Sequence, residues 1–332
     1  MTAPAATGAL SQAIAGALAK APAGDLATAA RALSLRYREG VGPYVRTAED
    51  ALAYAATRLP ATYAAVRAGG RQVAELWPAF APATQLDLGA GCGAAAWAAA
   101  SLWPSLARVV LADVDEHMIR VGQLLADGVA AGWDWQQLDV TCELGQAELV
   151  TACYLLGELE PAVQHDVALR AWEATTGCLL LVEPGTPAGF CLIRELRHEL
   201  VEAGAHLLAP CPEEGACPVG EGDWCHFSAR VARSGLHRNL KGAARSFEDE
   251  KFSYVAFART GAARAAGRVV RRPLHRRRFA ELAVCADGAI RTTGIGQSQP
   301  AYRSASRLAW GDAVPPEVLA AVRRDGRPLE RG

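Results

Sequence analysis

The chain has 332 residues, enough for one large domain or two of ordinary size, and 51% of them are hydrophobic, enough for a substantial core. No run of about 18 apolar residues lacks a charge or a helix breaker, and no basic residue precedes the apolar start, so we expect neither a transmembrane helix nor a signal peptide. The formal net charge is only −1, so binding of a polyanion would require a local basic segment. We expect a cytoplasmic protein without a membrane partner.

The N-terminal part is predicted to be helical. Residues 8–40 are alanine-rich with leucine and isoleucine at helical intervals, which indicates one or two helices. Thr47 followed by two acids predicts an N-cap, from which a helix runs until just before Pro60. A further helix is expected at 61–76. We assign these elements to a helical N-terminal module at residues 1–78.

Residues 79–205 are predicted to form an α/β domain. Apolar strand-like runs alternate there with helical stretches, which is typical of βαβ units and a mostly parallel, Rossmann-like sheet. The runs are expected at 85–89, 108–113, about 133–139, 147–156 and 178–183. Because parallel strands bind ligands at their carboxyl ends, the residues that end these runs should converge on one crevice.

The first run ends in a glycine-rich turn that a helical stretch follows directly. The turn residues are Asp87, Gly89, Gly91 and Gly93. Glycines let the backbone turn tightly and approach a ligand, although an ordinary tight turn fits the pattern as well. Asp113 lies where a ribose would be bound, and Asp139 would suit an adenine amino group. The acid before the turn and the spacing of these acids favour S-adenosylmethionine over a dinucleotide.

The stretch after the fourth run is where such an enzyme places groups beside the transferred methyl. Glu158 is the catalytic candidate there, as a general base or clamp for an acceptor nitrogen, and its alternative is a structural or cofactor-facing acid. The Asn/Asp-Pro-Pro-Tyr motif of amino methyltransferases is absent. In the helical module, Tyr54, Arg58 and Tyr63 either contact a ligand or, more commonly for such residues, pack against neighbours.

The nine cysteines fall into two groups. Five lie in or beside apolar runs and are expected to be buried hydrophobic residues. These are Cys92, Cys142, Cys153, Cys178 and Cys191. The others we interpret as ligands of a metal or cluster, because this chain is expected to stay in a reducing compartment where disulfides are rare.

Three cysteines of the second group lie in a loop of prolines, glycines and acids at residues 210–227. They are Cys211, Cys217 and Cys225. The loop shows no apolar face, and thiolates gathered in such a loop favour zinc or iron-sulfur iron. Paired Cys-x-x-Cys knuckles are absent, and the wide spacing suits a larger cluster. The fourth ligand is Cys285, which follows an apolar run, or His226, which adjoins Cys225 and is awkwardly placed.

The C-terminal part combines late strands with a strongly basic segment. Strands are expected at 248–257 and 279–285, with a turn at 287–288 after the second. Residues 229–278 contain 14 Lys and Arg against 3 Asp and Glu, which indicates either a solvated arginine-rich surface or an RNA-binding face. The RNA-binding candidates are Arg271, Arg272, Arg276, Arg277 and Arg278. We expect residues 206–332 to form a cysteine-rich, RNA-binding extension that completes the sheet.

Several motifs together resemble the mitoribosomal small-subunit methyltransferase-like family, whose bacterial members have about this length. They are AYAATRLPATYAA at 53–65, LDLGAGCG at 86–93, LLGELEP at 155–161, VEPGTPAGF at 182–190, the cysteine loop at 210–227, EDEKFSY at 248–254 and YRSASRLAWGD at 302–312. The cysteine loop and EDEKFSY are the specific ones, since the glycine turn is shared by class I methyltransferases generally.

The resemblance carries expectations about fold, ligands and partners. It implies a class I methyltransferase fold and a 4Fe-4S cluster on Cys211, Cys217, Cys225 and Cys285, with zinc as the competing occupant. It also implies a role in assembly or translational competence of the small ribosomal subunit, with its RNA as partner. Two functions stay open: methylation of ribosomal RNA, or a non-catalytic RNA-binding assembly factor that keeps S-adenosylmethionine as a ligand.

Overall fold

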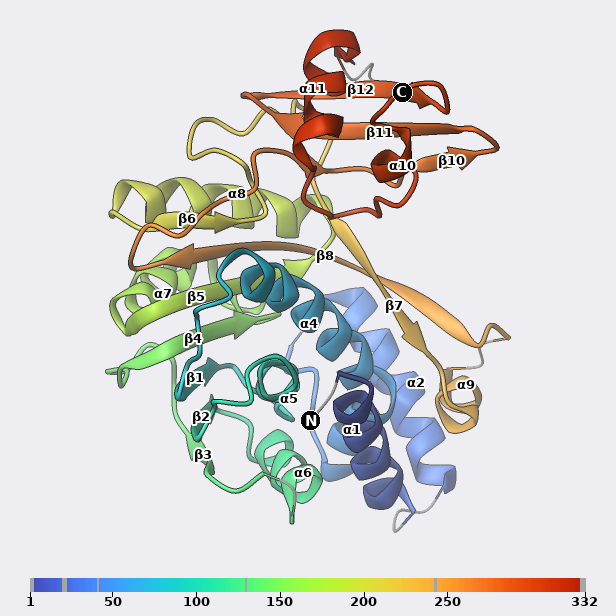
Figure 1. The fold of residues 1–332 in the computed structure, drawn as a ribbon. Helices are drawn as coiled ribbons and strands as arrows, with labels where there is room; N and C mark the ends of the chain where they lie inside the picture. The colour runs from blue at the N-terminus through green and yellow to red at the C-terminus, as the bar shows by residue number, and fades with distance from the viewer. Residues whose placement is uncertain (1–2, 20–22, 41, 129, 242–243, 329–332) are drawn as a thin grey trace.

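The N-terminal module consists of four helices. The computed structural model describes residues 3–19, 23–40, 42–128, 130–241 and 244–328 (Figure 1). The four helices are α1 (Ala3–Leu18), α2 (Ala23–Glu39), α3 (Ala48–Thr57) and α4 (Leu59–Leu76). Thr47 caps α3 as predicted, because its hydroxyl accepts the Asp50 amide at 3.2 Å. Helix α4 begins at Leu59 rather than 61, since Pro60 lies in the first turn, where its missing N–H costs nothing.

The central sheet confirms the predicted α/β fold. Its parallel strands are β1 (Thr84–Leu88), β2 (Arg108–Asp113), β3 (Trp133–Gln137), β4 (Ala147–Cys153) and β5 (Thr175–Pro184). Three further strands are β6 (His206–Ala209), β7 (Phe227–Ala232) and β8 (Phe247–Ala258). The strand order is β3-β2-β1-β4-β5-β8-β6, with β8 antiparallel to β5, β6 and β7. This is the mostly parallel, Rossmann-like sheet of a class I methyltransferase fold.

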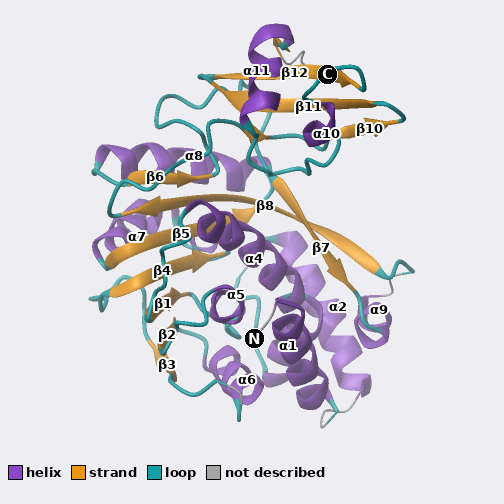
Figure 2. Ribbon diagram, viewed as in Figure 1, coloured by secondary structure: helices purple, strands orange, loops and turns teal. Residues whose placement is uncertain are grey.

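Helices cover both faces of this sheet, as Figure 2 shows. Helices α4, α5 (Ala94–Leu102) and α6 (Glu116–Ala126) lie on one face, and α7 (Pro161–Glu173) and α8 (Pro187–Glu202) lie on the other. Helix α9 (Gly235–Lys241) follows β7 and packs against α2 and α3. No helix in the described part of the chain combines the length and apolarity that crossing a membrane would need.

Strand β4 ends at Cys153, three residues earlier than expected. Tyr154 adopts a left-handed conformation, with φ of 57°, and the 3-10 turn η1 (Leu156–Glu158) follows. The buried Glu183 carboxylate at the end of β5 accepts the Leu156 amide at 2.9 Å. The apolar run therefore continues past the strand because its leucines pack in the core from a turn.

Residues 268–328 form a second sheet with its own core. Its strands are β9 (Arg268–Val269), β10 (Leu274–Arg276), β11 (Phe279–Ala286), β12 (Ala289–Gly296) and β13 (Arg327–Pro328), accompanied by helices α10 (Tyr302–Ala305) and α11 (Pro316–Asp325). The predicted turn between β11 and β12 is confirmed, with left-handed Asp287 and Gly288. Strands β6 to β8 complete the first sheet, whereas residues 268–328 build this separate one (Figure 1). The domain boundaries remain predictions.

We predict that Glu183 makes the stability of the protein fall as the pH rises from about 4.5 to about 7. Burial raises the pKa of this carboxyl to about 7 from an ordinary 4.5, so the folded state holds the proton more tightly than the unfolded state does. Its contribution is fully present below pH 4.5 and is lost as the pH rises through 7, a change of roughly 3 kcal/mol.

The variant Glu183→Gln should flatten this part of the curve of unfolding free energy against pH, as measured by denaturant unfolding at several pH values. The exposed Glu143→Gln variant is the control and should follow the wild type. A Glu183→Gln curve with the full wild-type slope would contradict the prediction.

Candidate functional site

A cavity of about 750 Å³ opens at the carboxyl ends of β1, β2 and β4. The residues predicted to hold a cofactor meet there, as parallel-sheet topology requires. Those lining it are Asp87, Gly89, Gly91, Asp113, Asp139 and Glu158. Gly93 does not line the cavity but lies at the N-cap of α5 with φ of 86°. The cavity is within the size range of small-molecule sites.

The glycine turn depends on backbone conformations and on one carboxylate. Gly89 and Gly91 have φ of 61° and 52°, and a Cβ on Gly89 would lie 2.6 Å from Leu155 Cδ1. Asp113 holds the turn, since its carboxylate accepts the Gly91 amide at 2.7 Å and the Asp115 amide at 2.8 Å. Burial raises the pKa of Asp113, and these amides oppose that effect. Its remaining lone pairs stay available to a ligand's hydroxyl groups.

Asp87 presents a buried oxygen without a partner. The residue is 1% exposed, and its Oδ1 accepts the Thr151 hydroxyl at 2.7 Å. Its Oδ2 has no hydrogen-bond partner among the described residues. Burial raises the pKa of Asp87 to about 7, against the opposing effects of the Thr151 hydroxyl and of the Ala96 amide, whose contact with the carboxyl does not meet the geometry of an ordinary hydrogen bond to Oδ2. A buried polar atom of this kind beside a cavity indicates that a polar ligand group completes it.

The far end of the cavity combines an exposed acid with apolar surface. Asp139 accepts both the amide and the hydroxyl of Thr141, at 2.9 and 2.8 Å, and these bonds lower its pKa. Val114 and Leu138 line the cavity beside it, and Val114 is 61% exposed. Sequence analysis missed Val114, although its position directly after the strand-ending acid was the available signal.

Helices of the N-terminal module form the roof. The rings of Tyr37 and Tyr44 stack with centroids 4.1 Å apart, and the Arg58 guanidinium lies 3.8 Å from the Tyr37 centroid. Together with Tyr54 they line the cavity. The contacts of Tyr54 and Arg58 with this cavity correspond to the ligand-facing alternative of the sequence analysis. Tyr63 corresponds to the packing alternative, since it is buried in the core and does not line the cavity. Tyr37 and Tyr44 were missed, because their part in the site depends on how the helices pack.

Glu158 lies at the mouth of the cavity, accessible to solvent yet closely surrounded by protein. Desolvation raises its pKa to about 7, the Asp113 charge adds to this, and Arg58 opposes it. Tyr154 lines the same cavity, and its hydroxyl donates to Glu250 Oε1 of β8 at 2.9 Å. Near neutral pH, Glu158 is therefore able to accept or release a proton.

A second cavity lies between β8 of the central sheet and β11 of the second sheet. Four cysteines from four places in the chain line it: Cys211 after β6, Cys217 in the following loop, Cys225 just before β7, and Cys285 in β11. All four are free thiols. His226 does not line this cavity and instead stacks on Trp224, with centroids 5.4 Å apart, so Cys285 rather than His226 shares the cavity with the three loop cysteines.

The four thiols influence one another electrostatically. Burial raises the pKa of Cys211, against the opposing effect of the Arg197 charge, and burial raises the pKa of Cys285 to about 12. Burial also raises the pKa of Cys225, with further increases from the charges of Cys211 and Cys217. No group of three or more His, Cys, Asp or Glu side chains in the described ranges is arranged to hold a single metal ion.

Two expectations about cysteines were wrong. The cysteine loop does have apolar surroundings, since the walls of its cavity include Phe190, Ile193 and Phe227, which come from other elements. Cys142 and Cys191 are exposed rather than buried, because one lies in the turn after Asp139 and the other on the outer side of α8. The burial expected for the other three is confirmed, namely for Cys92, Cys153 and Cys178.

The basic segment is partly neutralised within the fold. Arg230, Arg233 and Arg264 form ion pairs with carboxylates, and Arg271 pairs with Asp223. The remaining candidates are exposed and make no ion pair among the described residues. They are Arg272, Arg276, Arg277 and Arg278. Three of these four lie in the β10–β11 hairpin, where Arg278 has φ of 63°.

Comparisons with solved structures return methyltransferases at low identity. The magnesium protoporphyrin IX methyltransferase of Synechocystis PCC 6803 with bound SAM is 13% identical, with a TM-score of 0.40, covering 68% of this chain and 89% of that one. The plantazolicin methyltransferase BpumL in complex with SAH is 12% identical, with a TM-score of 0.42, covering 72% and 98%.

Sequence comparisons identify the family. The human ribosome assembly protein METTL17, mitochondrial, is 31% identical over 307 residues, which are 85% of this chain. The Rsm22-cox11 tandem protein 2, mitochondrial, of Schizosaccharomyces pombe is 28% identical over 186 residues, 42% of this chain. The chain spans 64% and 25% of the lengths of these relatives. The family model described as mitochondrial small ribosomal subunit Rsm22 matches residues 48–315, and the chain therefore belongs to the Rsm22 family.

Proposed function

We propose that this protein binds S-adenosylmethionine in the cavity at the ends of β1, β2 and β4 and acts on the RNA of the small ribosomal subunit. The main support for this ligand is a left-handed glycine turn combined with two acids in different roles. Asp113 holds the turn through the Gly91 amide, and Asp87 has a buried oxygen without a partner among the described residues. Membership of the Rsm22 family and the ribosome-assembly relative support the small subunit as target.

Each group of the ligand has a matching feature in the cavity. Asp113 would accept the ribose hydroxyls, and the unpartnered Asp87 Oδ2 would accept the ammonium of the methionine part. Val114 and Leu138 would flank the adenine, with Asp139 at its amino group. The glycine turn lets the backbone approach without a Cβ in the way.

We propose methyl transfer to RNA as the reaction, with Glu158 as the base for an acceptor nitrogen. A pKa of about 7 suits a carboxylate to this task near neutral pH. The non-catalytic assembly factor is the second candidate, and one observation favours it. Polar groups of the loop after β4 are hydrogen-bonded to other parts of the protein. The Leu156 amide donates to Glu183, and the Tyr154 hydroxyl donates to Glu250.

We also propose that Cys211, Cys217, Cys225 and Cys285 hold a 4Fe-4S cluster, with zinc as the competing occupant. Four free thiols around one apolar-walled cavity supply the ligand set of such a cluster. When bound, the cluster would join the end of β6, the cysteine loop and β11 covalently. Because these ligands are up to 74 positions apart in the sequence, such a link would contribute directly to folding.

Replacing Asp113 should weaken S-adenosylmethionine binding. Asp113→Ala removes a charged acceptor and should cost about 1–3 kcal/mol in binding free energy, measured by isothermal titration calorimetry. Asp134→Ala, on the exposed side of β3 and outside the cavity, should bind as the wild type does. Absence of binding by the intact protein would refute the ligand.

The reaction is tested by mapping methylated positions in small-subunit RNA from cells with and without the protein. A catalyst leaves a site that is unmethylated in its absence, and Glu158→Gln should lower methylation there at least about tenfold if proton transfer matters. Glu143→Gln serves as an exposed control. An unchanged methylation map together with defective subunits would favour the assembly factor.

Loss of one proposed cluster ligand should lower metal occupancy and melt the C-terminal sheet first. Anaerobically purified protein should be brown, with about four irons and four sulfides per chain. Cys285→Ser should reduce that content, whereas Cys191→Ser, at an exposed position on α8, should not. Colourless protein with one zinc per chain would overturn the cluster while keeping the four ligands.

The exposed arginines should make RNA affinity strongly dependent on salt. Replacing Arg276, Arg277 and Arg278 by Ala should flatten the plot of log affinity against log salt by about 0.7–0.9 for each phosphate group that is no longer neutralised. The control replaces Arg323 and Arg324 by Ala, because Arg323 is already paired with Asp287 and Arg324 with Asp325. An unchanged slope would assign the hairpin to the solvated surface.

A further inference from the structure

Three buried hydrogen-bond donors that find no partner among the described residues belong to side chains lining the four-cysteine cavity. They are the Tyr254 hydroxyl, Arg268 Nη2 and Arg197 Nε. The three residues are 3%, 1% and 6% exposed, so water does not readily satisfy these groups. Buried donors are nearly always paired in folded proteins, and three unpaired ones around one cavity indicate acceptors inside it.

Tyr254 reaches the cavity from β8, within the EDEKFSY motif. Its ring packs against α4 at Gly69, where a Cβ would lie 3.3 Å from the Tyr254 Cδ2 atom. The charges of Cys211 and Cys225 are among the causes that raise the pKa of Tyr254, after burial. Tyr254 lines the same cavity as these two proposed cluster ligands.

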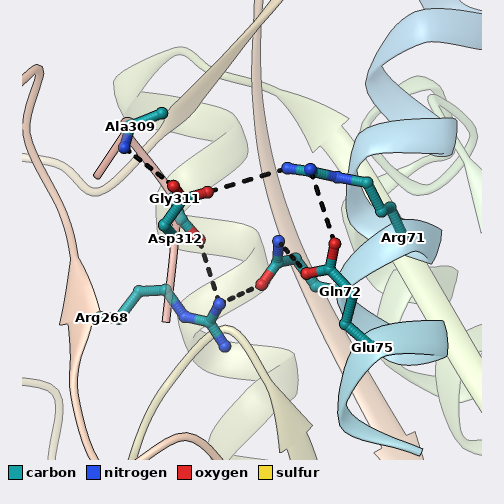
Figure 3. A network of polar contacts seen from close by, with 7 residues as sticks. All are labelled: Arg71, Gln72, Glu75, Arg268, Ala309, Gly311 and Asp312. Carbon is teal, nitrogen blue, oxygen red and sulfur yellow. Dashed lines mark hydrogen bonds and ion pairs between the residues drawn. The ribbon is translucent and has the colours of Figure 1, made fainter. Parts of the chain in front are cut away.

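Arg268 donates hydrogen bonds to neutral acceptors through Nε and Nη1. Its Nε donates to the Pro210 carbonyl at 2.8 Å, and its Nη1 donates to the Gly311 carbonyl at 3.0 Å and to the Gln72 side chain. Figure 3 shows the guanidinium between Gln72 and Gly311. These contacts leave Nη2 free at the cavity.

Arg197, on α8, is also bound by carbonyls, and a hydrogen bond between its side chain and Cys211 is among the effects that lower the pKa of that thiol. Its Nη2 donates to the carbonyls of Glu213 and Gly215, at 2.5 and 2.8 Å, which anchors the cysteine loop. No ion pair joins either arginine to a carboxylate in the described part of the chain. The carboxylate that lines the cavity, Glu213, accepts the Gly288 amide at 2.8 Å instead. Two buried positive charges therefore lack a countercharge from protein carboxylates.

We propose that Tyr254, Arg268 and Arg197 are positioning residues that donate hydrogen bonds to the sulfurs of the bound cluster, and that the two arginines balance its negative charge. The inference rests on the cluster proposed above. Thiolate and sulfide sulfurs are anionic acceptors, and buried charges are stable when paired and hydrogen-bonded.

Two consequences separate this role from simple packing. Reduction adds a negative charge to the cluster, so donors to its sulfurs favour the reduced form and raise the reduction potential. In the metal-free protein the same donors stay unsatisfied and destabilise the fold. Removing a donor should therefore have opposite effects on the loaded and the metal-free chain.

Tyr254→Phe is the sharpest test, because it removes one oxygen and keeps the ring. The full-length protein is purified anaerobically, and its cluster potential and melting temperature are measured before and after iron is removed with an oxidant and a chelator. We expect a more negative potential and a lower melting temperature in the loaded variant. The metal-free variant should melt at or above the metal-free wild type. Tyr302→Phe, in the second sheet's core, is the matched control and should leave the potential unchanged.

The arginines are tested by the potential alone, since their loss also breaks contacts within the fold. Arg197→Gln and Arg268→Gln should each shift it to more negative values. Arg194→Gln should shift the potential less than either of these variants. Arg194 is only half-buried, and its guanidinium lies 5.3 Å from the Phe190 ring centroid.

The outcomes test the presence of the cluster and the donor role of these residues separately. Iron-free wild-type protein would overturn the cluster itself. Loaded Tyr254→Phe protein with the wild-type potential, or a loss of stability that is equal in the loaded and metal-free states, would overturn the donor role while leaving the cluster in place.

Discussion

The buried guanidinium of Arg268 is the contact on which the arrangement of the two sheets depends. It bonds Pro210 beside the cysteine loop, Gln72 on α4 and Gly311 in the C-terminal part. A buried charge is costly unless hydrogen bonds satisfy it, so each of these three acceptors lowers the cost, while Nη2 is left without a partner among the described residues. The neighbouring ion pair between Arg71 and Asp312, at 3.8 Å and partly exposed, contributes little beside it (Figure 3).

Strand β8 connects the two cavities. Glu250 lines the cavity at the glycine turn and accepts the Tyr154 hydroxyl, whereas Tyr254 lines the cysteine cavity four residues later. Residues four apart lie on the same face of a strand, so one element supplies a polar side chain to each site. Asp249 pairs with Arg230 of β7, and Glu248 pairs with Arg233 just after that strand, so these ion pairs join β7 and β8. This division of tasks explains why the EDEKFSY stretch is so polar at its start and so apolar after it.

Local sequence patterns predicted a helix or strand well where a single physical cause determines that element. Alternating apolar runs with breakers between them predicted the parallel strands, and the Thr47 cap was visible because capping needs only neighbouring residues. The end of β4 was misjudged, because Tyr154 turns left-handed while the apolar composition continues to Leu156. Apolar composition indicates that a segment is buried. It does not distinguish a strand from a turn, because a buried leucine fits either.

The sequence by itself determined the glycine turn, the spacing of Asp87 and Asp113, and the three cysteines of the loop at 210–227, whereas the structure brought Cys285 rather than His226 to their cavity. These depend on short-range chemistry: a left-handed turn needs glycine, and thiol clusters need cysteine. Only the tertiary structure decided which groups surround them. The tyrosine roof, the free oxygen of Asp87 and the unpaired donors of Tyr254, Arg197 and Arg268 have no local signature. The contact between Gln72 and Arg268 joins residues 196 positions apart, and packing alone sets which partners such distant side chains find.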